Sequence, residues 1–303
     1  MKSKILVALL LLAVGLSTAT GFKVGDRDFQ AAGTIFNTKD LAEYGVTIVN
    51  PADPAYDAMV AGLSENKPNV MVEALRPFSV FIKNTSGRTV VAFALKWELM
   101  QPDGKIRIDE SDNTALWSLT GGEVSNMSEG VIRPGAAWFS TPFHPEAPHV
   151  PPTRGGSDAA RSEPEATEEL NRLREELAQY TNITVSLDGA FFDDGTFVGP
   201  DSTEFFAKVE AMRNARYDLL DSVKKNLTQG SPPDEVFGNL KEIENGPAPQ
   251  LSSSSSPADY YSAFRKATAA ELLRVRETYG DAQPVERVMQ KLRKPWPVLR
   301  KVR

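Results

Sequence analysis

The alternation of apolar and polar positions is clearest between residues 78 and 99. Large apolar side chains recur at every second position in residues 78–83 and again in residues 91–99. This period of two is typical of strands with one buried face. Between the runs, residues 84–88 have the composition of a turn, in which Gly87 is free to adopt a positive φ. The pattern predicts a β-hairpin whose apolar face needs a second sheet or a helix layer to cover it.

Shorter strand patterns surround this hairpin. Turns are expected at Pro102-Asp103-Gly104, at Arg133-Pro134-Gly135 and at Asp194-Gly195, the last of which is a strong hairpin signal. The strands expected from these patterns are residues 46–49, 70–75, 105–108, 116–119, 138–140, 183–187 and 196–198.

Helical periodicity dominates the second half of the chain. Asp201 followed by Glu204 is close to a capping box and predicts the start of a long helix that ends near Gly230. The apolar stripe of this helix is expected at Phe205, Val209, Met212, Leu220, Val223 and Leu227. A second stripe is expected at Tyr261, Phe264, Thr268, Leu272, Val275 and Tyr279. The remaining expected helices are a short one after Asp53 that reaches Leu63, and residues 166–180, 234–243 and 285–293.

Composition divides the chain into segments. Residues 142–165 are rich in Pro, Gly and charge, which indicates an exposed linker that leads into a helix. Because strand patterns return afterwards, we expect the linker and helix, at about 144–181, to be an insertion. A second linker, rich in Pro and Ser, lies at 245–256. The expected domains of this α+β chain are a β-sandwich at 22–200 that holds the insertion and a helical region at 201–303.

The expected turns between residues 71 and 143 follow a definite order. Asn-Thr-Ser-Gly at 84–87, Pro-Asp-Gly at 102–104 and Arg-Pro-Gly at 133–135 flank a strand with Lys-Trp-Glu at 96–98. This order resembles the immunoglobulin-like β-sandwiches of exported bacterial proteins. The resemblance covers under a third of the chain, rests on turn chemistry, and implies a fold without a function. The cysteine pair of antibody domains is absent, so Trp97 is expected to pack on aliphatic side chains.

The N-terminal residues predict a secretory signal peptide at 1–21. Lys2 and Lys4 precede an apolar run at 5–16, and small residues follow it. A membrane anchor is the weaker alternative, because the run is shorter than the roughly 20 residues of a spanning helix. Cleavage is expected after Ala19 or Gly21. The mature protein is then extracytoplasmic, either periplasmic or released, without a transmembrane segment.

Charge and cysteine content exclude several classes of protein. The net charge is −6, and loss of the two signal lysines makes it more negative, which argues against a nucleic-acid partner. The chain has no cysteine. Disulfides, cysteine nucleophiles, thiolate metal sites and lipid attachment at an N-terminal cysteine are therefore excluded.

The residues able to carry chemistry are few. His144 and His149 lie in the Pro-rich linker, where neither a metal site nor a catalytic triad is expected. The densest acidic cluster near a turn consists of Asp188, Asp193, Asp194 and Asp201. Its spacing does not fit a calcium-binding EF-hand loop, so turn formation is the favoured interpretation. The alternative is a hydrolase in which two of these carboxylates act as acid and base.

The C-terminal tail, residues 291–303, is basic and contains Trp296. A solvated terminus is the favoured interpretation, and contact with an anionic surface is the alternative. The sequence assigns no catalytic, cofactor-binding or metal-binding residue and implies no cofactor. The expected function is therefore that of a non-catalytic exported protein that binds a protein or polymer of the bacterial cell envelope, with the hydrolase as the alternative.

Overall fold

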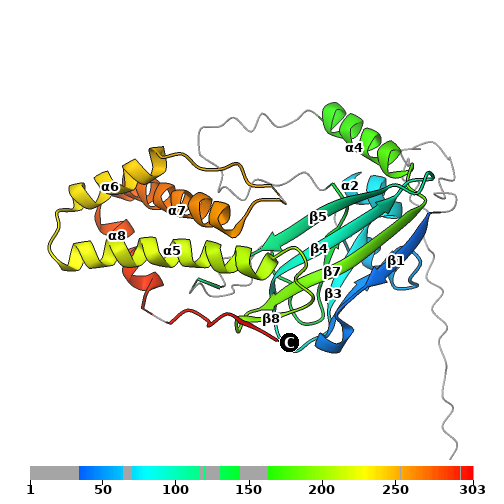
Figure 1. Cartoon of the computed structure of the whole chain (residues 1–303), viewed down its shortest axis with the longest axis horizontal. Helices are drawn as coiled ribbons and strands as arrows, with labels where there is room; N and C mark the ends of the chain where they lie inside the picture. The colour runs from blue at the N-terminus through cyan, green and yellow to red at the C-terminus, as the bar shows by residue number, and fades with distance from the viewer. Residues whose placement is uncertain are drawn as a thin grey trace, which may run out of the picture. The chain divides into compact units, whose positions relative to one another are not determined.

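The computed structural model describes residues 34–63, 70–115, 119–120, 130–143, 163–252, 254–293 and 295–302. The expected signal peptide, most of the strand expected at 116–119 and the linker with His144 and His149 lie outside these residues. Gly33–Arg303 form one compact unit. The structure confirms the α+β class, with two open β-sheets and several helices (Figure 1).

The larger sheet, sheet A, is built around two long antiparallel strands, β4 and β7. Strand β4 pairs with β7 along one edge and with β5 along the opposite edge. The turn between β4 and β5 contains Gly104 at φ 83°. The other edge of β7 is shared: β1 runs parallel to its first half, and β8 runs antiparallel to its end. Strand β9 adds to β8 in parallel. The bounds are β1 Ile35–Lys39, β4 Val90–Met100, β5 Ile106–Thr114, β7 Asn182–Phe192, β8 Thr196–Val198 and β9 Arg300–Lys301.

The smaller sheet, sheet B, has the order β2-β3-β6, and each pair is antiparallel. Its strands are β2 Val46–Val49, β3 Val80–Asn84 and β6 Ala137–Ser140. Helices α1 (Tyr56–Leu63) and α2 (Val70–Leu75) contribute Tyr56, Val60 and Val72 to a core cluster that includes Phe81 of β3. Phe93 of β4 meets Trp138 of β6 edge to face, with ring centroids 6.4 Å apart, so the two sheets are in contact.

The expected hairpin at 78–99 is wrong. Both strands form, but β3 pairs only within sheet B and β4 only within sheet A. The connecting residues instead form a corner around Asn84, which is fully buried. Its amide donates to the carbonyl oxygens of Arg88 and Ile132, and its oxygen accepts from the backbone N–H and hydroxyl of Ser86. These bonds hold the chain as it crosses between the sheets, and Gly87 does not need a positive φ there.

The strand expected at 70–75 is also wrong, because these residues form helix α2. Val72 and Leu75 are buried, and their spacing of three places them on one side of a helix. A short apolar run fits a strand and a buried helical turn equally well by periodicity. The 3-10 turn η2 (Arg76–Phe78) then leads into β3.

Strand β4 is covered differently along its length. Residues 90–95 are all buried, whereas Lys96, Glu98 and Met100 are partly exposed. The first half is buried on both faces because Ala92 and Ala94 lie in a cluster with residues of helix α5 (Phe205–Thr228). The second half is covered on one face only, as the alternation in the sequence predicts.

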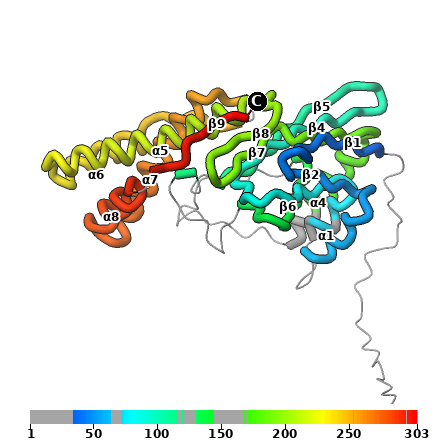
Figure 2. The backbone as a smooth tube through the Cα atoms, turned by 90° about the horizontal axis from the view of Figure 1, so that it is seen from below, coloured from blue at the N-terminus to red at the C-terminus, as the bar shows by residue number. Residues whose placement is uncertain are grey.

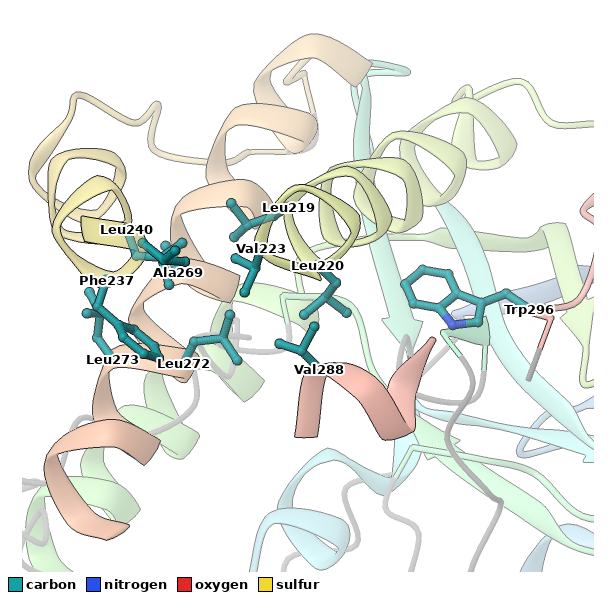
Figure 3. Close-up of a cluster of buried hydrophobic side chains, with 11 residues drawn as sticks. Leu219, Leu220, Val223, Phe237, Leu240, Ala269, Leu272, Leu273, Val288 and Trp296 are labelled. Carbon is teal, nitrogen blue, oxygen red and sulfur yellow. The ribbon is translucent and has the colours of Figure 1, made fainter. Parts of the chain in front are cut away.

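The helices after β8 share a core of their own (Figure 3). The expected stripe of α5 is buried at Val209, Met212, Leu220 and Val223. Tyr279 is the exception in α7, since its side chain is 67% exposed at the helix end. The other helices are α4 Glu163–Leu177, α6 Pro233–Asn245, α7 Pro257–Tyr279 and α8 Ala282–Lys291, with a further 3-10 turn η1 at Ala42–Tyr44. Ser256 and Asp259 form a capping box at the start of α7.

Replacing Trp97 tests the core between the sheets. Trp97 is fully buried, and its Nε1–H donates to the Ser111 hydroxyl at 3.1 Å. We expect Trp97→Ala to lower the free energy of unfolding by about 3 to 5 kcal/mol in urea denaturation. The control is Ile108→Ala, whose side chain is 56% exposed and whose loss should change stability by no more than about 0.5 kcal/mol. Equal, small effects of both substitutions would contradict the assignment of Trp97 to the core.

Limited proteolysis tests whether the helices are one unit. The segment between α6 and α7 is mostly exposed where it is described. Helices α5, α6 and α7 nevertheless contribute to one apolar cluster. We expect the first cut between residues 245 and 256, after which the two fragments should elute together from a size-exclusion column in native buffer. Immediate separation of the fragments would show that this cluster does not hold the helices together.

Candidate functional site

The four candidate aspartates lie around the end of β7 and the loops that follow it. Asp188 is in β7, Asp193 and Asp194 are in the turn between β7 and β8, and Asp201 is in the loop before α5. Asp193 is exposed, and its backbone N–H donates to the carbonyl oxygen of Thr89. Each of the other three carboxylates has its own set of hydrogen-bond and ion-pair partners.

Asp188 joins sheet A to the loop before α5. Its side chain is 2% exposed, and each carboxylate oxygen accepts two hydrogen bonds. One oxygen accepts from the N–H and hydroxyl of Ser202, and the other accepts from the same groups of Thr203, at 2.6 to 2.8 Å. Burial alone raises the pKa of Asp188, but the bonds from Ser202 and Thr203 outweigh it, so the net pKa is lowered. Asp188 therefore acts as a buried anchor for the loop.

Asp194 forms the β7–β8 turn, as the sequence predicts, and also binds cations. Its Oδ1 accepts the N–H of Thr196, and Gly195 follows at φ 82°. Its Oδ2 lies 3.5 Å from Arg88 and 3.2 Å from Arg300. Burial raises the pKa of Asp194, but the Thr196 hydrogen bonds and the two arginines lower it further than burial raises it. The turn therefore presents a carboxylate that is ionised and paired.

Asp201 has an unusual backbone conformation. Its φ is 61°, which costs a residue other than glycine about 1 to 3 kcal/mol and persists only where the surroundings impose it. Here its N–H donates to the Asp188 carbonyl oxygen. Its Oδ1 then accepts the N–H of Phe206, and its Oδ2 lies 2.8 Å from Lys301. The expected capping box is wrong, because Glu204 itself occupies the cap position and makes no side-chain cap bond.

The C-terminal tail is ordered against the sheet rather than solvated, which corrects the favoured interpretation from the sequence. Trp296 is 6% exposed in the helical core. Arg300 and Lys301 form β9 beside β8 (Figure 2), through bonds from the Arg300 N–H to the Gly195 oxygen and from the Val302 N–H to the Phe197 oxygen. The two motifs that the sequence singled out, the acidic turn and the basic tail, are thus partners.

Lys208 and Glu110 are charged residues near the acidic group that the sequence pattern does not single out. Lys208 is 8% exposed on α5, and its Nζ lies 5.8 Å from the centre of the Tyr260 ring. Burial raises the pKa of Glu110, as does nearby Asp188, while the positive charge of Lys208 opposes the shift. The sequence does contain a signal for the burial of Lys208, because the helical period places it on the apolar stripe between Phe205 and Met212. The cross-strand neighbour of Glu110 could not be read from the sequence.

A second surface is the open face of sheet A, on the side away from sheet B. Cross-strand partners share a face, so the pairing register identifies its members. Ile106 and Ile108 of β5 are 58% and 56% exposed, and Ile35 of β1 is 60% exposed. Between them lie polar residues with partial exposure. The rows across the face are Ile35, Asn182, Met100 and Ile106; Asn37, Thr184, Glu98 and Ile108; and Lys39, Ser186, Lys96 and Glu110.

Further comparisons add no assignment. Among the described residues, no group of three or more His, Cys, Asp or Glu side chains is placed to hold a metal ion. No helix in the described part of the chain is long and apolar enough to cross a membrane. The chain matches no family model, no curated protein and no solved structure.

Replacing Asp188 tests its role as an anchor. We expect Asp188→Asn to lower the free energy of unfolding at pH 7 by about 2 to 4 kcal/mol, because Ser202 and Thr203 lose an ionised acceptor. Since folding lowers the pKa of Asp188, the stability it contributes is present above the unfolded value of about 3.9. That stability is lost as the pH falls through the folded value. The difference between wild type and variant should therefore shrink in acid.

Urea denaturation from pH 7 down to about pH 3 measures this difference. The matched control is Asp193→Asn in the same turn region, which removes an exposed carboxylate and should change stability by no more than about 0.5 kcal/mol. A pH-independent effect of Asp188→Asn would mean that ionisation of this residue is not what holds the loop.

Proposed function

We propose that this chain is a non-catalytic exported protein that binds another protein of the bacterial cell envelope through the open face of sheet A. The observation that carries the proposal is the exposure of Ile35, Ile106 and Ile108 on one face. Single exposed apolar residues are normal, but adjacent ones rimmed by polar residues mark interaction sites. Ile106 and Ile108 form such an adjacent pair at one edge of the face, and Ile35 lies at the other edge, beyond β4 and β7. The polar side chains between them can supply the hydrogen bonds of a protein interface.

The partners of the four aspartates favour a binding protein over the hydrolase alternative. A general acid needs a raised pKa and access to substrate. Asp188 and Asp194 instead have lowered pKa values. The two carboxylate oxygens of Asp201 accept the N–H of Phe206 and pair with the ammonium group of Lys301. These carboxylates are used to order loops and to bind the tail.

Export and the immunoglobulin-like architecture are part of the same proposal. The N-terminal pattern at 1–21 supports export through a cleaved signal peptide. The crossing between the sheets at Asn84 and the contact of Phe93 with Trp138 support a sandwich of the immunoglobulin-like kind, in which consecutive strands also change sheets. The helical insertion between β6 and β7 and the helices after β8 are additions to that sandwich.

Site-specific photocrosslinking tests the binding face. A photoreactive amino acid replaces Ile108 in the full chain, expressed with its own N-terminus in the native host, and the cells are irradiated. We expect one discrete crosslinked protein from position 108. The control position is Tyr279, which is 67% exposed on α7 and outside the face. It should give no such product.

A second substitution distinguishes a specific interface from chance proximity. Ile106→Asp, next to the crosslinker on the same strand, should abolish the product at 108 without changing the thermal melting of the purified protein. If the product persists with Ile106→Asp, or appears equally at 279, the open face is not the binding surface. Crosslinks to polysaccharide alone would instead identify an envelope polymer as the ligand.

A further inference from the structure

We propose that the edge of β8 opposite β7, with Asp194 and Asp201, is a receptor for a basic extended strand of another protein, and that the chain's own tail occupies it in competition. The tail binds in the manner of an added β-strand, in which backbone bonds supply affinity and side-chain contacts supply specificity. This proposal is independent of the open face of sheet A.

The two basic side chains of β9 each pair with a different carboxylate beside β8. Arg300 reaches Oδ2 of Asp194 at 3.2 Å, and its Nε–H donates to the Thr196 hydroxyl at 3.1 Å. Lys301 reaches Asp201 at 2.8 Å, and its Nζ lies 5.7 Å from the centre of the Phe197 ring. Two adjacent basic residues of one strand thus each have a carboxylate on the receiving edge.

Asp201 is the carboxylate at this edge that is most enclosed around its cationic partner. Its side chain is only 10% exposed, and Lys301 is the cation paired with its outer oxygen. When the tail departs, this carboxylate is left at the edge without Lys301, and a lysine or arginine of another strand can take the same place. The bonds from the Asp201 N–H to the Asp188 oxygen and from the Phe206 N–H to Asp201 Oδ1 hold the carboxylate in that place.

The edge also admits a strand at close range. Gly195 lies so near the tail that a Cβ on it would come 2.5 Å from the carbonyl oxygen of Val298. Leu299 packs against the apolar cluster around Phe197 and Phe205. A matching partner therefore has the pattern of the tail itself, an apolar residue followed by two basic ones in extended conformation.

The tail is held loosely enough to be displaced. Beyond Trp296, the packing of Leu299 and the bond from Arg213 to the Pro297 oxygen, the tail is held by the two-residue strand β9 and by two ion pairs whose basic side chains are 65% and 42% exposed. Val298 is 76% exposed and Val302 is 39% exposed. Such pairs are individually weak and screened by salt. The tail owes much of its occupancy to the high effective concentration of a tethered segment.

Peptide binding to the full chain tests the proposal. The probe is a fluorescein-labelled peptide of residues 297–303, Pro-Val-Leu-Arg-Lys-Val-Arg, followed by fluorescence anisotropy. Full-length Arg300→Glu/Lys301→Glu should release its own tail, because both carboxylates then repel it. We expect this variant to bind the probe at least tenfold more tightly than wild type, because the tail occupies the edge in most wild-type molecules.

A second release variant guards against misfolding of the first. Val302→Pro keeps both basic residues and removes the N–H that the Phe197 oxygen accepts, so it should also bind the probe more tightly than wild type. Adding Asp194→Asn and Asp201→Asn to either variant should remove the increase in affinity for the probe. Asn keeps an oxygen that can accept the N–H of Thr196 or Phe206, but it lacks the negative charge. A probe with Glu at its two central basic positions should not bind.

Three results would overturn the proposal. One is equal binding of the probe to wild type and to both release variants. Another is equal binding of the charge-reversed probe. The third is a dimer of wild type that forms as its concentration rises and that Arg300→Glu/Lys301→Glu abolishes, which would assign the edge to the tail of a second copy.

Discussion

The first half of β4 is covered on both faces, so it lies at the centre of the contacts between sheet A, sheet B and the start of α5. Sheet B covers one face through contacts such as Phe93 with Trp138. On the other face, Ala92 and Ala94 lie in an apolar cluster with residues from the first turns of helix α5. Where the second cover ends, the alternate positions become Lys96 and Glu98, and the open face begins. The two halves of one strand thus differ in their cover, because the first is buried on both faces and the second is partly exposed on one.

The sequence was informative where one local signal has one structural solution. Alternation predicted β4, Asp-Gly predicted the β7–β8 turn, and apolar stripes predicted α5 and α7. It failed where the outcome depends on distant residues. The corner at Asn84 looks like a hairpin turn, because a turn signal does not state whether the next strand joins the same sheet. Its buried amide is held in part by Ile132, which lies far along the chain.

The candidate sites show the same division. The turn role of Asp194 was predictable from Asp-Gly, but its pairing with Arg300 joins residues that have no common local pattern. Asp188 looked like one more acidic residue near a turn, and its burial became apparent only from the four hydrogen bonds to Ser202 and Thr203. The exposed isoleucines were equally hidden, because their common face depends on the register of β1, β7, β4 and β5. Sequence identified the right groups and could not identify their partners.

The pairing of β4 with β7 has a consequence for the order of events during synthesis. Strand β5 follows β4 directly and can pair with it at once, but β7 begins only at Asn182. During that interval the other edge of β4, rich in β-branched and aromatic residues, has no partner from its own sheet. Unpaired edges of this kind template association between chains. The insertion between β6 and β7 therefore lengthens the period in which a nascent chain is open to aggregation, and a fast-binding chaperone would have its greatest effect in that interval.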